Sequence, residues 1–260
     1  DRVRIVLMET THPGNVGAVA RAMKNMGLTQ LYLVNPAIWP SEVADKRAAG
    51  GLDVLASAHV VPSLEQAMGD CVLVIGASAR SRSLPWPVMN PRDSVAMAAK
   101  FIDQGPVAFV FGREDRGLTN EELHRCHYHV HIPANPEYSA LNLAMAVQVV
   151  AYELRMAHMQ GLESETMHPH MAPMHSPLDP GWDVAPATAA EVDGMLEHLE
   201  AVLVRIGFHA PEHPRQLMTR LRRLYQRTHL DKMEVNILRG MYKAIQKAVP
   251  PGGSGAPTDE

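Results

Sequence analysis

The chain has 260 residues, of which 46% are hydrophobic, so it can form one large domain or two small ones around a buried core. No apolar run approaches the ~18 residues of a membrane-spanning helix. The net charge of −4 argues against a uniformly cationic nucleic-acid binder, and two cysteines, Cys71 and Cys126, argue against a disulfide framework or a CxxC metal site. We therefore expect a cytoplasmic protein with reduced thiols and no signal peptide.

Short apolar segments alternate with helical patterns from residue 1 to about 157. We expect strands at 4–8, 30–34, 59–61, 72–76, 107–111 and 128–132. We expect helices at 15–27, 41–49, 63–68, 93–103, 120–126 and 142–159. This alternation predicts an α/β fold with a mostly parallel sheet that is flanked by helices.

The first strand runs into a polar loop that contains Pro13, Gly14 and Gly17. Asn15 lies at the predicted helix start, and Arg21 lies about two turns further on in a helix rich in Ala and Met. Turn chemistry, an N-cap at Asn15 and a surface position for Arg21 would also account for these residues. The loop lacks the GxGxxG and GxxxxGK[ST] spacings, so it predicts neither a dinucleotide site nor a P-loop.

Two further strands end in polar loops, at residues 112–118 and 132–142. Taken alone, Glu114 could be a solvated carboxylate, and Ser139 and Asn142 could be helix caps. All three loops, however, leave the carboxyl ends of predicted parallel strands. We therefore expect them to converge on one edge of the sheet, where open α/β sheets bind ligands.

The sequence pattern changes at residues 161–187, which are rich in Pro, Met and His and have no period. This composition predicts a flexible linker. Its histidines, His168, His170 and His175, lack the carboxylate or cysteine spacing that would support a metal site, and no metal is expected.

Residues 188–250 predict a small module of three helices, and residues 251–260 predict a disordered tail. Residues 184–250 hold ten Lys or Arg against seven Asp or Glu, a balance of +3 that leaves −7 for the rest of the chain. A local basic patch of this kind often meets phosphates. A solvated helix face would give the same pattern, but we expect an RNA contact at the arginines of the second helix: Arg215, Arg220, Arg222, Arg223 and Arg227.

Three long segments carry a family resemblance. ETTHPGNVGAVARAMKNMG at 9–27, FVFGREDRGLTNEEL at 109–123 and IPANPEYSALNLAMAVQVVAYE at 132–153 resemble the signature motifs of the SPOUT superfamily of RNA methyltransferases. With ASARSRSLPWP at 77–87, they are most similar to the bacterial TrmJ family. The resemblance implies methylation of the ribose 2′-hydroxyl of the pyrimidine at position 32 in the tRNA anticodon loop, with S-adenosyl-L-methionine as cofactor.

The resemblance also implies an architecture. The methyltransferase domain, 1–160, would contain a trefoil knot in its C-terminal half, an exception to the rule that chains do not thread loops. A linker at 161–187 would lead to a basic helical extension at 188–250 that serves tRNA binding or dimerisation, and then to the tail at 251–260. The family is an obligate homodimer in which each active site borrows residues across the interface.

Four polar residues match those that the family places around the reacting ribose and the cofactor: Arg21, Asn15, Glu114 and Asn142. The family's arginine has been proposed as a general base, but a guanidinium stays protonated at neutral pH, so we expect Arg21 to clamp a phosphate and stabilise charge. Asn15 would orient Arg21 or the ribose, and Glu114 would hold Arg21 or Asn15 from the facing subunit. The cofactor contacts carried over by position, mainly backbone groups, are Ala77, Ser78, Ala79, Gly112, Ile132, Ser139, Ala140 and Leu141.

Ala140 departs from the family pattern, because many members have serine two positions before the asparagine that Asn142 matches. Ser139 is adjacent, but on a helix its side chain would point about 100° away. Two other readings therefore stay open: a non-catalytic RNA-binding protein on the same fold, and a 2′-O-methyltransferase of another RNA site.

Overall fold

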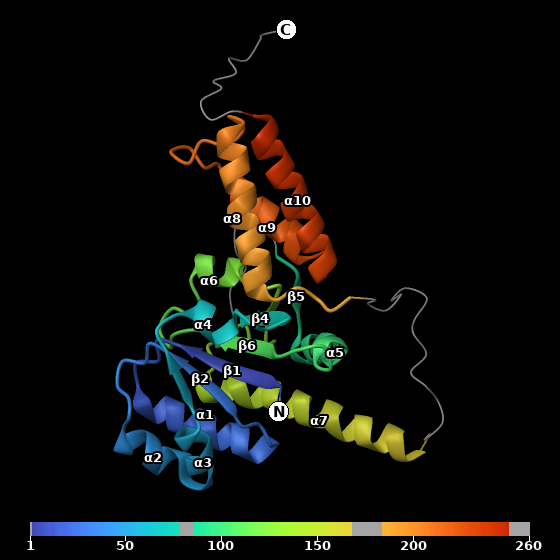
Figure 1. Ribbon diagram of the computed structural model, residues 1–260. Coiled ribbons are helices and arrows are strands. Elements are labelled where there is room, and N and C mark those ends of the chain that lie inside the picture. Colours follow the sequence, from blue (N-terminus) through green and yellow to red (C-terminus); the bar gives the residue numbers. More distant parts are fainter. Residues whose placement is uncertain (1, 79–85, 168–183, 250–260) are drawn as a thin grey trace. The chain divides into compact units, whose positions relative to one another are not determined.

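The structure is a computed structural model that describes residues 2–78, 86–167 and 184–249 (Figure 1). The expected cofactor residue Ala79, the three linker histidines and the tail 251–260 lie outside the described residues. The chain divides into two compact units, residues 1–181 and 182–260.

The first unit is built on a seven-stranded sheet in which every described strand pair is parallel, in the order β3-β2-β1-β6-β4-β7-β5. The α/β class and the parallel sheet predicted from the sequence are confirmed. The strands are β1 (Val3–Met8), β2 (Gln30–Val34), β3 (His59–Val61), β4 (Leu73–Ala77), β5 (Val88–Met89), β6 (Val107–Phe111) and β7 (Tyr128–Val130).

Helices cover both faces of this sheet (Figure 1). The short helix α3 and the strand β5 were not predicted, and α7 continues well past the expected helix end at residue 159. The helices are α1 (Pro13–Met26), α2 (Glu42–Ala48), α3 (Leu52–Ala56), α4 (Leu64–Met68), α5 (Pro91–Phe101), α6 (Asn120–His124) and α7 (Leu143–Met167), and one 3-10 turn spans Ala49–Gly51.

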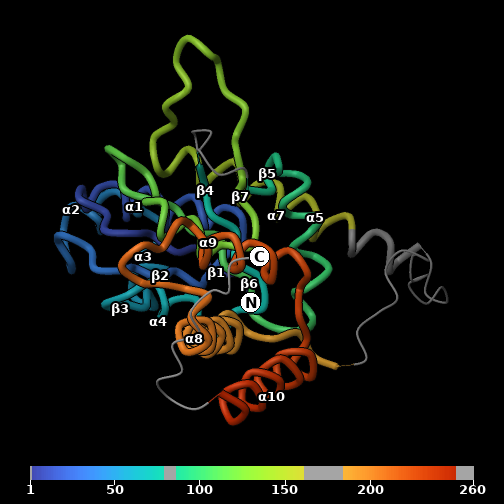
Figure 2. The backbone as a smooth tube through the Cα atoms, turned by 90° about the horizontal axis from the view of Figure 1, so that it is seen from above, coloured from blue at the N-terminus to red at the C-terminus, as the bar shows by residue number. Residues whose placement is uncertain are grey.

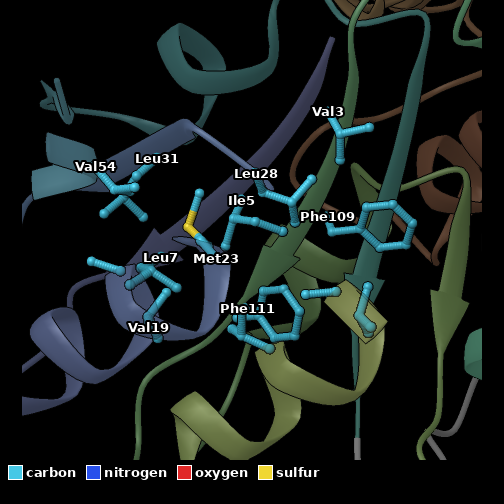
Figure 3. Packing of buried hydrophobic residues seen from close by; sticks show 14 of the residues in the cluster. Val3, Ile5, Leu7, Val19, Met23, Leu28, Leu31, Val54, Phe109 and Phe111 are labelled. Carbon is cyan, nitrogen blue, oxygen red and sulfur yellow. The ribbon is translucent and has the colours of Figure 1, made fainter. Parts of the chain in front are cut away.

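The strands at the centre of the sheet are apolar along their whole length because both of their faces are covered. Ile5, Val6 and Leu7 of β1 are each at most 1% exposed. Figure 3 shows Val19 and Met23 of α1 beside Ile5 and Leu7, in a cluster that α5 and α7 also join. Burying one such side chain contributes roughly 1.5–3 kcal/mol, so the cluster fixes α1 and α7 on the sheet.

The register of the strands brings their carboxyl ends to one edge. Leu7 of β1 lies opposite Phe111 of β6, and Ala77 of β4 lies opposite Val130 of β7. The loops that follow these strands therefore start side by side. Figure 2 shows the segment after β7, in yellow-green, projecting as a long loop before α7 begins.

Helix α1 begins two residues earlier than expected, and its N-cap is His12 in place of Asn15. The His12 Nδ1 accepts a hydrogen bond from the Gly14 amide at 3.1 Å. Pro13 occupies the first helical position, where its missing N–H costs nothing. Asn15 is thereby released from capping, and its side chain is available for other partners.

The second unit is helical and has its own core. Its helices are α8 (Ala189–Arg205), α9 (Leu217–Gln226) and α10 (Lys232–Ala248). Both α8 and α10 begin with a capping box, which satisfies two end N–H groups reciprocally. Residues 184–187 of the expected linker pack here, since Ala187 is buried and its amide donates to the Leu230 carbonyl at 2.9 Å. Among the described residues, no helix is long and apolar enough to cross a membrane.

Candidate active site

Three residues, one from the first turn of α1 and two from the loops after β6 and β7, form a hydrogen-bonded row at the carboxyl edge of the sheet. The Asn15 side-chain nitrogen donates to Glu114 Oε1 at 2.9 Å, and the Asn142 side-chain nitrogen donates to Asn15 Oδ1 at 3.1 Å. Asn142 Oδ1 in turn accepts the Ala144 amide at 2.9 Å, at the start of α7. The row orients both amides, because an ionised carboxylate can only accept and so must face the nitrogen of Asn15.

The Glu114 carboxylate is saturated with donors. Besides Asn15, it accepts from the Thr11 amide and hydroxyl, both at 3.1 Å, and from the His12 amide at 3.3 Å. Burial alone would raise the pKa of Glu114, but these hydrogen bonds outweigh it and hold the pKa below its usual value. Glu114 is therefore ionised at neutral pH and ties the loop after β6 to the loop after β1.

A cavity of about 310 Å³ opens beside this row and is lined by the loops after β4, β6 and β7. Its size falls at the lower end of the range for small-molecule sites. Glu114, Asp115 and Arg116 bring charges of both signs to its wall, which suits a zwitterionic ligand. Seven of the eight expected cofactor residues line the cavity: Ala77, Ser78, Gly112, Ile132, Ser139, Ala140 and Leu141.

The cavity wall after β6 is a tight turn in which two positions, Gly112 and Gly117, accept only glycine. Gly117 has φ +71°, in the left-handed region. A Cβ on Gly112 would lie 2.0 Å from the carbonyl carbon of Gly117. The Arg113 and Gly117 backbones close the turn with two hydrogen bonds, of 3.2 and 2.9 Å.

Arg21 forms no hydrogen bond with the Glu114–Asn15–Asn142 row of the same chain. It is exposed and, among the described residues, has no hydrogen-bond or ion-pair partner. It borders a second hollow of about 400 Å³ between α1 and α7, together with Met145 and Gln148. Leu141 lines both hollows. Glu114 thus holds Asn15 within its own chain and does not contact Arg21 there. The expected contact from the facing subunit stays a prediction.

Sequence reasoning missed Arg113, which is only 7% exposed and contacts two carboxylates. Its Nε donates to Glu9 at 2.8 Å, and this hydrogen bond keeps the pKa of Glu9 below its usual value although partial burial opposes the shift. Glu9 lies far from Arg113 in sequence, and Glu122 belongs to a capping box, so no local sequence pattern predicts that the three side chains meet.

The arginines of the second unit divide into two groups. Arg215, Arg220 and Arg227 are exposed, as expected for a phosphate-binding surface. Arg222 and Arg223 are partly buried, and Arg222 forms an ion pair with Asp193 of α8. Arg222 is therefore less available to RNA than the exposed arginines, and the expected RNA contact of this group stays a prediction. In the described part of the chain, no group of three or more His, Cys, Asp or Glu could hold a metal ion.

Comparisons with known proteins match both units. The model of the SpoU rRNA methylase family matches residues 2–152, and the model of the tRNA methyltransferase TrmJ C-terminal domain matches residues 190–253. The chain is 50% identical over 247 residues to the tRNA (cytidine/uridine-2′-O-)-methyltransferase TrmJ of Pectobacterium atrosepticum, covering 95% of this chain and 98% of the relative.

Two further proteins are similar to this chain over nearly its whole length. The tRNA (cytidine/uridine/adenosine-2′-O-)-methyltransferase TrmJ of Pseudomonas aeruginosa is 49% identical over 257 residues, with 95% of each chain covered. The crystal structure of TrmJ from Z. mobilis ZM4 matches with a TM-score of 0.76 at 31% identity, covering 94% of this chain and 98% of that one.

Proposed function

The chain belongs to the SpoU rRNA methylase family, and from this membership we infer that it is a tRNA (cytidine/uridine-2′-O-)-methyltransferase that takes its methyl group from S-adenosyl-L-methionine. The observation that carries the proposal is the cavity lined by the loops after β4, β6 and β7, with the Glu114–Asn15–Asn142 row beside it. The target is the ribose 2′-hydroxyl of the pyrimidine at position 32 in the anticodon loop, and the enzyme acts in the cytoplasm.

The cofactor contacts are backbone and small side-chain groups of the cavity wall. Bound there, S-adenosyl-L-methionine would supply a methyl group on a cationic sulfonium; a ribose oxygen would bond to that methyl carbon as its bond to sulfur breaks, leaving S-adenosylhomocysteine. The chain's task is then alignment of the two reactants, worth several kcal/mol of the barrier. Among the described residues, Asn15 and Asn142 each keep a second side-chain N–H without an acceptor, and these can hold ribose or cofactor oxygens.

Glu114 is a poor general base in this arrangement. Its two carboxylate oxygens already accept four hydrogen bonds, which fill the usual lone-pair sites. Taking a proton from the ribose would break part of that set. Glu114 therefore orients Asn15, and the proton of the 2′-hydroxyl passes with the help of an RNA phosphate that Arg21 clamps.

The position of Arg21 supports a homodimer in which it completes the site of the partner subunit. Its guanidinium has no acceptor among the described residues and borders a hollow between α1 and α7, so it is placed to meet a second molecule. The exposed Met145 of α7, 57% accessible, lies at the same hollow and would be covered in such a dimer.

A trefoil knot in the first unit is supported by the order of the strands. β7 follows β4 and β5 in sequence but lies between them in the sheet, so this later strand is inserted between two earlier ones. Residues 1–160 then form the methyltransferase domain, 161–187 the linker and 188–250 the helical tRNA-binding or dimer extension. In that extension the exposed Arg215, Arg220 and Arg227, with Arg223, contact the tRNA backbone.

A direct assay tests the proposal. The protein is incubated with labelled S-adenosyl-L-methionine and bulk tRNA, and the 2′-O-methyl group is mapped by nuclease resistance. Methylation at a pyrimidine in position 32 is expected. A methyl group at another position would favour a different RNA site. Absence of transfer, with tRNA still bound, would favour the non-catalytic reading, for which the Ala140 side chain in the cavity wall is the motivating observation.

A further inference from the structure

A buried arginine in the cavity wall joins three segments of the chain. Arg113 follows β6 directly, and its side chain is 6% exposed. Its Nε donates to Glu9 Oε2 at 2.8 Å, and its two terminal nitrogens donate to the two oxygens of Glu122 at 3.0 Å each. Glu9 follows β1, and Glu122 lies in α6, so one guanidinium connects three elements.

Each partner is itself fixed by the backbone. Glu9 has φ +41°, and its amide donates to the Val34 carbonyl at 2.8 Å. Glu122 accepts the Thr119 amide at 2.7 Å in the capping box of α6. A planar guanidinium with five donors matches this two-carboxylate arrangement, whereas a lysine ammonium offers no bidentate fork.

Arg113 and its neighbour Glu114 both bind the segment that follows β1. Arg113 binds Glu9, and the adjacent Glu114 binds Thr11 and His12 of the same loop after β1 and Asn15 in the first turn of α1. The turn that starts at Arg113 forms the cavity wall. A shift of the guanidinium would therefore move the wall and the carboxylate that orients Asn15 together.

We propose that Arg113 is a positioning residue for methyl transfer: through Glu9 and Glu122 it sets both the turn at 112–118 and the place of Glu114. The proposal rests on the assignment of the cavity to S-adenosyl-L-methionine. Arg113 touches neither reactant in this scheme, and its effect passes through the wall of the cavity and through the Glu114–Asn15 hydrogen bond.

The chain contains a matched control at the other end of β1. Arg4 donates to both oxygens of Asp70, at 2.5 Å each, and to the Ala67 carbonyl at 3.0 Å. Its side chain is 12% exposed, against 6% for Arg113, and Arg4 itself does not line the cavity, whereas Arg113 does. Arg4→Lys thus damages a comparable ion pair at the opposite end of β1 without touching the turn.

The test compares Arg113→Lys, Glu9→Gln and Arg4→Lys at a temperature at which circular dichroism shows each to be folded. Binding of S-adenosylhomocysteine is measured by calorimetry, and kcat and KM are measured with tRNA. Arg113→Lys is expected to weaken S-adenosylhomocysteine binding and to lower kcat/KM by on the order of 100-fold, the cost of a misplacement of about 1 Å. Glu9→Gln, which spares the Glu122 fork, is expected to have a smaller effect of the same kind, and Arg4→Lys to lower only the melting temperature.

Hydrogen exchange of the ligand-free proteins supplies a readout that does not depend on catalysis. Amides at 112–118 are expected to exchange faster in Arg113→Lys than in wild type, and to be unchanged in Arg4→Lys. Equal exchange at 112–118 in the two lysine variants, or equal ligand affinity, overturns the positioning role. If the wild type binds S-adenosylhomocysteine but methylates no tRNA, the proposed function fails while the exchange and binding comparison still decides the role of Arg113.

Discussion

The side-chain nitrogen of Asn15 donates to Glu114 across 2.9 Å, although the two residues lie 99 positions apart in the chain. The contact exists because β1 and β6 pair in parallel, with Leu7 opposite Phe111, so that the loops after them start together. It places an ionised carboxylate and an oriented amide at the edge of the cavity.

Glu114→Gln should destabilise the protein by about 1 kcal/mol at pH 7, because an amide cannot accept from all four donors and partial exposure limits the cost. The folded-state pKa of Glu114 is lowered, so its contribution is present above the unfolded value of 4.5 and is lost as the pH falls through the folded value. Urea unfolding at pH 7 and at pH 3.5 measures both. A stability gap that persists unchanged at the lower pH would contradict the role of the carboxylate charge.

Arg21→Lys should keep tRNA and cofactor binding but lose methylation, with kcat reduced by on the order of 100-fold, because an ammonium cannot clamp a phosphate bidentately. Single-turnover rates with saturating tRNA measure the step. Arg92→Lys is the control, since Arg92 is exposed on α5 and pairs with Glu153 away from the cavity. Near wild-type turnover of Arg21→Lys would show that the bidentate role is wrong.

Replacing Arg215, Arg220 and Arg227 by Gln should reduce the slope of log K against log salt for tRNA binding by about 2–3 units, because each lost phosphate contact removes one released counterion. Filter binding from low to moderate salt measures the slope. Arg222→Gln should leave it nearly unchanged, because Asp193 already neutralises that arginine. An unaltered slope in the triple variant would remove this helix from the tRNA contact.

Gly112→Ala should cost on the order of 1–3 kcal/mol, since the new methyl group meets the Gly117 backbone and the turn must open. It should also weaken S-adenosylhomocysteine binding, because the same turn lines the cavity. Gly194→Ala is the matched control, for nothing lies within 4 Å of its Cβ position and α8 should gain up to ~1 kcal/mol. Denaturant unfolding and calorimetry report the two effects, and a neutral Gly112→Ala would mean that the turn adapts.

The sequence predicted the main strands closely because buried parallel strands are continuous apolar runs, as at Val107–Phe111. It missed β5 because Val88–Met89 is only two residues long and follows Pro87, which gives no period to detect. Helix α3 was missed for a similar reason, since its five residues follow Gly50 and Gly51, which read as a loop.

The sequence also located the residues of the candidate site but not their connections. The convergence of Asn15, Glu114 and Asn142 followed from the parallel arrangement of their strands. The N-cap was misplaced because histidine is an uncommon cap, whereas Asn15 is a favoured one. Arg113 was missed because its role depends on its contact with Glu9, which lies 104 positions away in the sequence. Only the pairing of strands in the sheet brings the two residues together.

The helical unit is held together by its own core, which includes Met195, Leu199 and Tyr242, and two of its three helices carry their own capping boxes. None of these stabilising groups is borrowed from the sheet. If Arg215, Arg220 and Arg227 bind tRNA as proposed, natural selection can alter these side chains to suit new tRNAs while the sheet edge stays the same. The range of substrates and the methyl-transfer reaction can then evolve at separate rates within one chain.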